Sequence, residues 1–297
     1  MSTTLAANWA SGIHDPATAE IFTAGMVEEM GPDSAWQFFN VLPSTSLTTQ
    51  NVGVDGPSAY QQRTDNEEIP LSDVAQRNTK TYTQVEHSNG FSISFKARMF
   101  SEAALIARFF AQLGGAAGQL FNESMYDVLE GGFTDTGPDG VSLFDASHPI
   151  DKTGGTVSNL GTTALDFDAL AAARAVMRRS KTSSGMKLRS EPQFLIVPPE
   201  TADTARQLVS SAVTSAALQT NTFAGQLQVI SSAYIVDVND WFLASAQNKH
   251  QLKMYLAKGP TPEMRIDPKT KALVMDDIVV FDSGYDDFRG TFGANVA

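Results

Sequence analysis

The sequence predicts an α+β protein in which a long polar arm projects from a folded body. Between Ser44 and Asn89 the few hydrophobic residues are scattered among Thr, Gln, Asn, Ser and Asp. Unstructured connections of that length are uncommon inside domains, and the Thr, Val and Tyr of this stretch favour extended backbone. An apolar pattern with helical spacing follows over residues 101–130, and short strand and helix patterns alternate after it. These observations favour a mixed fold with a two-stranded arm.

Residues 1–33 are expected to form an N-terminal arm that contains a helix over residues 15–31. Asp15-Pro16 suits a helix cap and first turn, and Gly31-Pro32 ends the pattern. The apolar stripe of this helix consists of Ile21, Phe22, Met26, Val27 and Met30.

The polar arm is assigned to residues 46–89, and its turns are expected at Gly53, Gly56-Pro57, Pro70 and the acidic residues 65–68. A two-stranded ribbon by itself is marginally stable in water, so we expect the arm to lie against a neighbouring subunit. The candidate intersubunit contacts in the arm are Tyr60, Arg63, Glu67, Glu68, Arg77, Lys80 and Tyr82.

A strand and a long helix are predicted next. Apolar and polar residues alternate over residues 91–99, which predicts a strand with one buried face. Ser101 suits the N-cap of the helix over residues 101–130. Three glycines inside this helix, at 114, 115 and 118, each cost about 1 kcal/mol relative to Ala. We therefore expect either a bend there or a close contact with a sheet.

The remainder of the chain predicts short elements around a loop region at residues 131–163. A helix opens at Asp166 or Asp168, and another runs from about Thr201 to Ser211. Short strands are expected at residues 194–197, 227–238, 241–243, 252–256 and 278–281.

The charge of the chain is acidic and unevenly distributed. The formal net charge is −12, which argues against tight binding of nucleic acid through phosphate contacts. Residues 1–62 contain no Lys or Arg, whereas a basic strip gathers Arg174, Arg178, Arg179, Lys181, Lys187 and Arg189. The first four residues of the strip are further candidate contacts. The strip is either a solvated face or a docking site for the acidic N-terminal region, in the same or a neighbouring subunit.

No catalytic, cofactor or metal site is predicted. The chain has no cysteine, and its four histidines do not occur at metal-ligand spacings. Asp145, Ser147 and His148 stand side by side, but a catalytic triad is an arrangement in space, so a structural role for His148 is favoured over a hydrolase. The acidic residues near the C-terminus are interpreted as solvated turns: Asp276, Asp277, Asp282, Asp286 and Asp287. No apolar run reaches the length of a membrane span, so no membrane partner is expected.

An ordered series of short segments carries a family resemblance. The series comprises Gly140-Val141-Ser142-Leu143-Phe144-Asp145-Ala146-Ser147-His148-Pro149, Asn159-Leu160, residues 194–199, residues 229–231, residues 241–243 and residues 286–290. In this order, over residues 20–295, the chain resembles the HK97-type major capsid proteins of tailed phages. The Mu-like major head subunits are the branch that it resembles most.

The resemblance implies a shell subunit that is not an enzyme and needs no cofactor. Such subunits assemble as pentamers and hexamers, in the host cytoplasm, into an icosahedral virion capsid around double-stranded DNA. The polar arm would be the E-loop, which lies over the adjacent subunit. The peripheral P domain would take residues 34–45, 90–165 and 255–297, with the spine helix at 101–130. The axial A domain would take residues 166–254.

The resemblance also implies partners. These are further copies of the chain and the enclosed DNA, without sequence-specific binding. A portal and a decoration protein are further candidates, and scaffolding is expected from either a separate protein or none. Some relatives cross-link through an arm lysine; Lys80 is the only lysine of the polar arm here, and no cross-link is expected. The alternative function is an encapsulin-like compartment that encloses an enzyme cargo.

Overall fold

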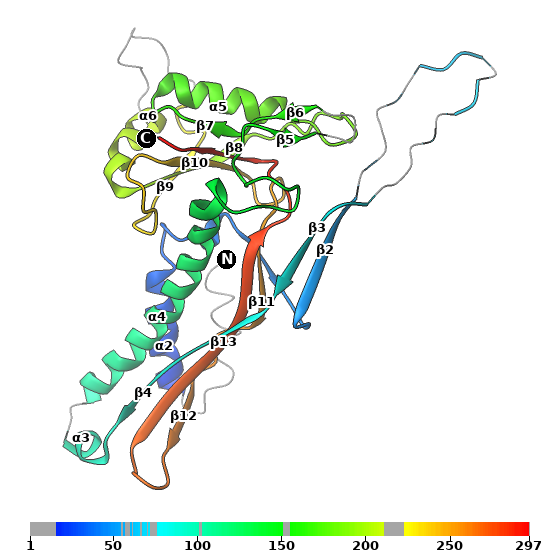
Figure 1. Cartoon of the computed structure of the whole chain (residues 1–297). Coiled ribbons are helices and arrows are strands. Elements are labelled where there is room, and N and C mark those ends of the chain that lie inside the picture. Colours follow the sequence, from blue (N-terminus) through cyan, green and yellow to red (C-terminus); the bar gives the residue numbers. More distant parts are fainter. Residues whose placement is uncertain are drawn as a thin grey trace.

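The computed structural model describes residues 16–54, 56, 60, 62–65, 67–69, 71, 76–100, 103–150, 155–210 and 223–296. The predicted caps at Asp15 and Ser101, residues 1–15 of the predicted N-terminal arm, and Pro57 and Pro70 lie outside this range. Within it, two five-stranded sheets form the body, and a two-stranded ribbon leaves its side (Figure 1).

The first sheet is built around one long strand, β13 (Leu273–Tyr285). Its strands run in the order β1-β11-β13-β12, with β4 (Val85–Ile93) paired antiparallel to β13 over residues 273–281. The other strands are β1 (Asn40–Pro43), β11 (Leu252–Lys258) and β12 (Glu263–Ile266). The prediction found only residues 278–281 of β13, because Asp276 and Asp277 interrupt its apolar alternation.

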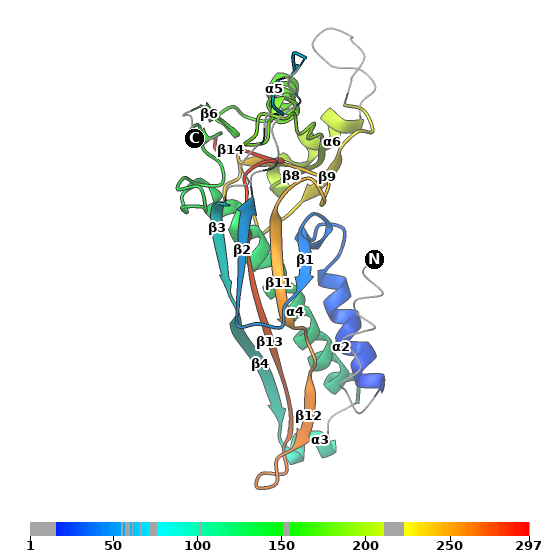
Figure 2. The same cartoon turned by 90° about the vertical axis from the view of Figure 1, so that its right-hand side faces the viewer.

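The glycines of the long helix mark a helix–helix contact, so the expected contact with a sheet is wrong. Helix α4 (Ala103–Glu130) runs beside α2 (Pro16–Glu29), as both views show (Figures 1 and 2). A Cβ atom on Gly114 would lie 2.0 Å from the carbonyl oxygen of Phe22, and one on Gly25 would lie 2.1 Å from that of Ala111. The two backbones therefore touch at a distance that only glycine permits.

The strand predicted over residues 91–99 is wrong beyond Ile93. Residues Phe95–Phe100 form a short helix, α3, although their pattern alternates. The Ser94 side chain accepts a hydrogen bond from the backbone N–H of Ala97 at 3.2 Å, as the N-cap residue just before a helix commonly does. A local cap therefore overrides the strand-like alternation.

The second sheet lies between the helices α5 and α6 on one side and the C-terminal end of α4 on the other. Its order is β7-β14-β10-β8-β9, and α5 (Phe167–Arg179) and α6 (Ala202–Ser210) cover one face. Asp166 caps α5, because its side chain accepts from the N–H of Ala169 at 2.7 Å. The strands are β7 (Leu160–Gly161), β8 (Pro192–Val197), β9 (Gln228–Ser231), β10 (Trp241–Ser245) and β14 (Thr291–Ala294).

Strand β10 shows how the core is shared between the two halves of the body. Trp241 and Leu243 pack with α5 and α6, whereas Phe242 and Ala244 pack against the aromatic residues of α4. The strand is therefore buried on both faces, which explains its continuous apolar run. Strand β14 joins this sheet beside β10, whereas the resemblance assigned residues 255–297, which include β14, to the P domain.

The remaining elements are short. The predicted loop region contains β5 (His148–Pro149) and β6 (Thr156–Val157), and the strand predicted over residues 227–238 stops at Ser231. Among the described residues, single turns of 3-10 helix occur at Ala35–Gln37, Gly131–Phe133 and Pro199–Thr201.

The ribbon consists of β2 (Thr48–Val54) and β3 (Gln76–Thr83), which pair antiparallel with each other. The chain after Thr83 returns to the body at once as β4. The predicted arm, which ends at Asn89, therefore includes five residues that pair with β13 of the same chain.

Candidate intersubunit interface

Besides Asp282, which accepts from the backbone N–H of Thr83 at 2.8 Å, the ribbon is held at its root by the carboxylate of Asp286. Its Oδ1 accepts from the Tyr82 hydroxyl at 2.7 Å, and its Oδ2 accepts from Asn51 Nδ2 at 2.9 Å and from Lys253 Nζ at 2.6 Å. The Asn51 side chain also hydrogen-bonds the Tyr255 hydroxyl. Burial, and then the charge of Asp286, raise the pKa of Tyr82, so that its hydroxyl remains a donor. We call Asp286, Tyr82, Asn51, Lys253 and Tyr255 the ribbon clamp.

The clamp corrects the interpretation of the C-terminal acidic residues as solvated turns. Asp286 is largely buried in an ion pair, and Asp277 is 6% exposed. Sequence reasoning missed the clamp because its partners are far apart in the chain: Asn51 and Asp286 are 235 residues apart. The resemblance series includes Asp286, which is the one sequence signal that pointed there.

Two of the predicted arm contacts lie against their own body. Tyr82 is fully buried, with its ring 4.8 Å from that of Tyr255. Lys80 Nζ lies 5.8 Å from the ring centroid of Tyr82 and 5.9 Å from that of Tyr285, which places its ammonium over two aromatic faces. Tyr82 is therefore buried within its own subunit and is not proposed as an intersubunit contact.

Other residues of the arm are exposed. Arg63, Glu67 and Glu68 are exposed, whereas Arg77, on β3, is half-buried. Large apolar side chains accompany them: Leu47, Val54, Tyr60, Ile69 and Leu71 are each more than half exposed. Apolar groups gathered on one projecting segment are typical of a surface that another molecule covers.

The basic strip is partly neutralised within its own chain. Arg178 Nε lies 2.6 Å from Glu191 Oε1, and Arg174 lies 3.6 Å from the same carboxylate while its guanidinium stacks over Phe223. Among the described residues, no ion pair joins Arg179 or Lys181 to a carboxylate, and both are exposed. These two cations, together with the exposed Lys187 and Arg189, are therefore the part of the strip that faces outward.

Three of the acidic residues of the N-terminal region lie on a helix that packs against the body. Glu20, Glu28 and Glu29 lie on α2, which packs along α4. The Tyr234 hydroxyl donates to Glu29 Oε1, and Asn122 Nδ2 donates to the backbone oxygen of Glu29 at 3.1 Å. An acidic surface on α2, rather than a free acidic arm, is therefore what a neighbouring copy would meet.

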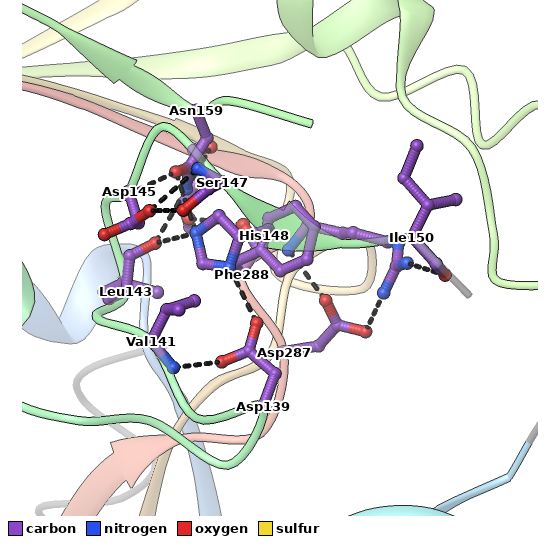
Figure 3. A network of polar contacts seen from close by, with 12 residues as sticks. Asp139, Val141, Leu143, Asp145, Ser147, His148, Ile150, Asn159, Asp287 and Phe288 are labelled. Carbon is purple, nitrogen blue, oxygen red and sulfur yellow. Dashed lines mark hydrogen bonds and ion pairs between the residues drawn. The ribbon is translucent and has the colours of Figure 1, made fainter. Parts of the chain in front are cut away.

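His148 lies at the centre of a polar network that supports its structural interpretation (Figure 3). The imidazole is 0% exposed and stacks on Phe288 with the ring centroids 3.7 Å apart. Its Nδ1 is 2.7 Å from Asp139 Oδ2, and its Nε2 is 3.0 Å from Asn159 Oδ1. Both ring nitrogens thus face oxygen atoms inside the protein, and neither faces solvent.

The adjacent Asp145 and Ser147 make a separate pair. Ser147 Oγ donates to Asp145 Oδ1 at 2.7 Å, and this hydrogen bond lowers the pKa of the Asp145 carboxyl. Figure 3 shows both side chains beside the imidazole, but no hydrogen bond joins Ser147 to His148. A nucleophile activated by His148 is therefore not assembled here.

The network ties the loop region to the C-terminal segment. Arg289 Nη1 lies 2.6 Å from Asp287 Oδ2, while its Nε donates to the backbone oxygen of Lys181 at 2.7 Å. The ring of Phe288, which lies between Asp287 and Arg289 in the chain, stacks on the His148 imidazole (Figure 3). Two segments of the resemblance series, residues 140–149 and 286–290, are thus in direct contact.

Substitutions in this network are expected to separate structural from catalytic roles. Asp139→Asn should lower the free energy of unfolding by about 1–2 kcal/mol, because a charge-assisted hydrogen bond to a buried imidazole is lost. Ser147→Ala should change it by less than about 0.5 kcal/mol, because Ser147 is exposed. Urea unfolding of both variants measures this difference. Equal effects would contradict the structural interpretation of His148.

A second buried histidine makes stability depend on pH. His250 is 1% exposed, its Nδ1 accepts from the N–H of Leu252, and burial lowers its pKa to about 4. Below pH 6.5 the His250 imidazole binds a proton in the unfolded chain but not in the folded chain. The free energy of unfolding therefore decreases as the pH is lowered. By pH 5 the loss should be roughly 2 kcal/mol. His250→Asn, which keeps the acceptor, should flatten the profile between pH 7 and pH 5. An unchanged slope in urea unfolding would refute this assignment.

Neither a metal site nor a membrane segment is found in the part of the chain that the structure describes. No three or more Asp, Glu or His side chains there are arranged to hold a metal ion. No helix there has the length and apolar character to cross a bilayer.

Comparison with known proteins identifies the family. A family model described as phage capsid protein matches residues 77–294, which is more than two-thirds of the chain. The match includes β3, both sheets except β1, and the His148 network. No curated protein matches the sequence.

Solved structures share the fold at low identity. A chain of the capsid of bacteriophage JBD30, decorated with minor capsid protein trimers, is 16% identical, with a TM-score of 0.57 over 69% of this chain and 92% of that chain. A chain of the mature capsid of bacteriophage PhiM1 is 13% identical, with a TM-score of 0.60 over 87% and 85%. A chain of Mycobacterium phage Patience is 12% identical, with a TM-score of 0.57 over 94% and 87%.

The fold matches, the family model and the exposed ribbon agree. The chain belongs to the phage capsid protein family and is a major capsid protein with the HK97-type fold, which forms the shell of the virion.

Proposed function

We propose that the protein is the major head subunit of a tailed phage, in the Mu-like branch, and that pentamers and hexamers of it close an icosahedral shell around double-stranded DNA. The observation that carries the proposal is the projecting arm, with exposed apolar side chains on and around its two strands, on a body whose main hydrophobic core contains no residue of β2 or β3. The net charge of −12 supports a shell that encloses DNA without binding it tightly.

The parts of the subunit follow from the two sheets. The first sheet with the spine helix α4 corresponds to the P domain, and the second sheet with α5 and α6 to the A domain. Strands β2 and β3 with their connection correspond to the E-loop. Compared with the boundaries expected from the sequence, we move β4 from the E-loop to the P domain and β14 to the A domain, because each pairs there.

The ribbon would lie over the adjacent subunit. Its contacts would come from exposed side chains in the connection between its two strands, Tyr60, Arg63, Glu67 and Glu68. The ribbon clamp would set the direction in which the ribbon leaves the body. Many weak contacts of this kind, repeated around a closed shell, give a stable particle.

Electron microscopy of the purified assembly tests the proposal. Closed particles with icosahedral symmetry that contain DNA after infection are expected. Tubes or solitary subunits would overturn it. Particles that hold a cargo protein instead of DNA would support the encapsulin-like alternative, which the phage capsid family match does not favour. Assembly in the host cytoplasm and the lack of enzymatic activity are part of the proposal. A scaffolding protein, a portal and a decoration protein stay predictions of the resemblance.

Reversing the charge of the basic strip should impair assembly. The double substitution Arg178→Glu and Arg179→Glu would present like charges to an acidic α2 surface of a neighbouring copy, and like-charge contacts at an interface cost several kcal/mol. We expect the yield of particles to fall by at least roughly tenfold. Arg206→Glu, on the exposed face of α6 beside Asp203, is the matched control. Sedimentation measures the yield, and normal assembly of the double variant would discard the contact.

A further inference from the structure

One asparagine of the chain, Asn89, is followed directly by a glycine, Gly90, and none of the other asparagines is. A glycine has no side chain to shield its backbone nitrogen, so this nitrogen can approach the side-chain carbonyl carbon of the residue before it. Attack at that carbon forms a cyclic imide and releases the side-chain amide as ammonia. Asn89-Gly90 is therefore the pair in this chain that is best suited to such a conversion.

Both residues lie on β4, at the edge of the first sheet (Figure 2). Among the described residues β4 pairs with β13 and with no other strand, and Asn89 and Gly90 are both exposed. Water and hydroxide ions therefore reach the Asn89 side chain and the backbone that follows it.

The Asn89 side chain is already turned towards the nitrogen that would attack it. The Gly90 N–H donates a hydrogen bond to Asn89 Oδ1 at 2.8 Å. The carbon to be attacked, Cγ, is bonded directly to this oxygen. Two reacting groups that are held beside each other react much faster than groups that must first meet.

The packing of β4 against β13 requires the glycine. A Cβ atom on Gly90 would lie 2.7 Å from the carbonyl oxygen of Met275 and 2.9 Å from the Cβ atom of Asp276. A residue with a side chain, which would shield the nitrogen, therefore does not fit at this position. The reactive pair is thus a consequence of how closely the two strands approach.

We propose that Asn89 is a site of spontaneous deamidation, in which water converts its amide to a carboxylate through a cyclic imide with Gly90. Hydroxide removes the proton of the Gly90 nitrogen, whose electron pair then attacks Asn89 Cγ. The Cγ–Nδ2 bond breaks, and Nδ2 takes a proton from water and leaves as ammonia. Water then opens the imide ring: cleavage between the nitrogen and Cγ gives aspartate, and cleavage at the main-chain carbonyl gives isoaspartate.

The reaction places a new charge in a cavity that is already acidic. Asn89 lies opposite Asp277 in the β4–β13 ladder, and both line a cavity of about 480 Å³ between these strands and α4. Glu86 and Glu123 also line it, and its described lining contains no Lys or Arg. Burial raises the pKa of the Asp277 carboxyl, so the site already disfavours one negative charge. Like charges directly opposite each other destabilise a strand pair, so deamidation weakens the pairing of β4 with β13.

The isoaspartate product has a further effect on the strand, because it adds one carbon atom to the backbone between residues 89 and 90. Ser88 pairs with Ile278 on one side of this point, and Phe91 pairs with Met275 on the other. A longer backbone cannot keep both pairs in register. Both products therefore loosen β4, which follows β3 of the ribbon directly in the chain.

Mass spectrometry of the purified full-length chain, incubated in a mildly alkaline buffer and then digested, tests the proposal without reference to shell assembly. Asn248 is the internal control, because it is exposed but is followed by Lys249, whose N–H donates to the carbonyl oxygen of Ala246 at 2.7 Å. The peptide with Asn89 should be deamidated at least roughly tenfold faster than the peptide with Asn248, and should yield both aspartate and isoaspartate. Equal rates, or no conversion of Asn89, would overturn the proposal.

Three variants separate the reaction from its consequence. Asn89→Gln should abolish the conversion, because the longer side chain closes a larger ring; a mass gain that persists in this peptide would refute the assignment to Asn89. Asn89→Asp should lower the midpoint of urea unfolding and speed hydrogen exchange along β4. Ser92→Asp adds the same charge to an exposed position of the same strand, opposite Val274 and away from the cavity, and should do neither. Equal effects of the two aspartate variants would refute the repulsion from Asp277.

Discussion

Gly114→Ala is expected to lower the free energy of unfolding by more than about 4 kcal/mol, which is an exceptional effect for one methyl group. The added Cβ atom would lie 2.0 Å from the carbonyl oxygen and 2.9 Å from the carbonyl carbon of Phe22, both of which are backbone atoms. Backbone cannot rotate away as a side chain does, so α2 must separate from α4. The separation exposes Phe22 and Met26, which are 2% and 1% exposed.

The neighbouring glycine provides the matched control. A Cβ atom on Gly115 would meet only the carbonyl oxygen of Gly25, at 3.9 Å, which is an ordinary contact. Gly115→Ala should therefore keep or raise stability, by up to about 1 kcal/mol, because Ala has the higher helix propensity. Urea unfolding of the two variants, side by side, measures the contrast. Similar stabilities would show that α2 and α4 do not touch as described.

Asp286→Ala should destabilise the subunit by about 3 kcal/mol and loosen the root of the ribbon, because three donors lose their shared acceptor. The donors are the mostly buried ammonium of Lys253, the Tyr82 hydroxyl and Asn51 Nδ2. Hydrogen exchange at the amides of β2 and β3 should become faster, while exchange in the second sheet should not change. We expect subunits with such a free ribbon to assemble poorly, since its direction is no longer set.

Asp276→Ala is the matched control for that prediction. Asp276 also pairs with a cation, Arg265, but the two side chains are 39% and 56% exposed. An exposed ion pair is screened by solvent and adds little to stability, so this variant should unfold and assemble as the original chain does. If Asp276→Ala were as damaging as Asp286→Ala, the clamp would have no special role.

Prediction from sequence succeeded where the signal was local and periodic. The helix at residues 101–130, the helix after Asp166 and the buried run at residues 194–197 were all confirmed, because spacing and caps specify them over a few turns of chain. It failed at residues 95–99, where a cap at Ser94 outweighed the alternation, and at the glycines of α4, whose partner helix is ninety residues away in the chain.

For the candidate interface, too, the sequence predicted the local features but not the contacts between distant segments. The sequence marked a polar arm, a basic strip and a structural His148, and the resemblance placed them in a capsid subunit. Which residues of the arm face outward depended on contacts between distant segments: Tyr82 is buried because Asp286 and Tyr255 meet it.

By itself, then, the amino-acid order determined the helices, most strands and the shell-forming family of this protein, since these depend on residues that are close together in the chain. The tertiary structure alone decided the α2–α4 approach, the insertion of β14 beside β10 and the clamp at Asp286. Each of these is a meeting of surfaces from remote parts of the chain, and no local pattern encodes which surfaces meet.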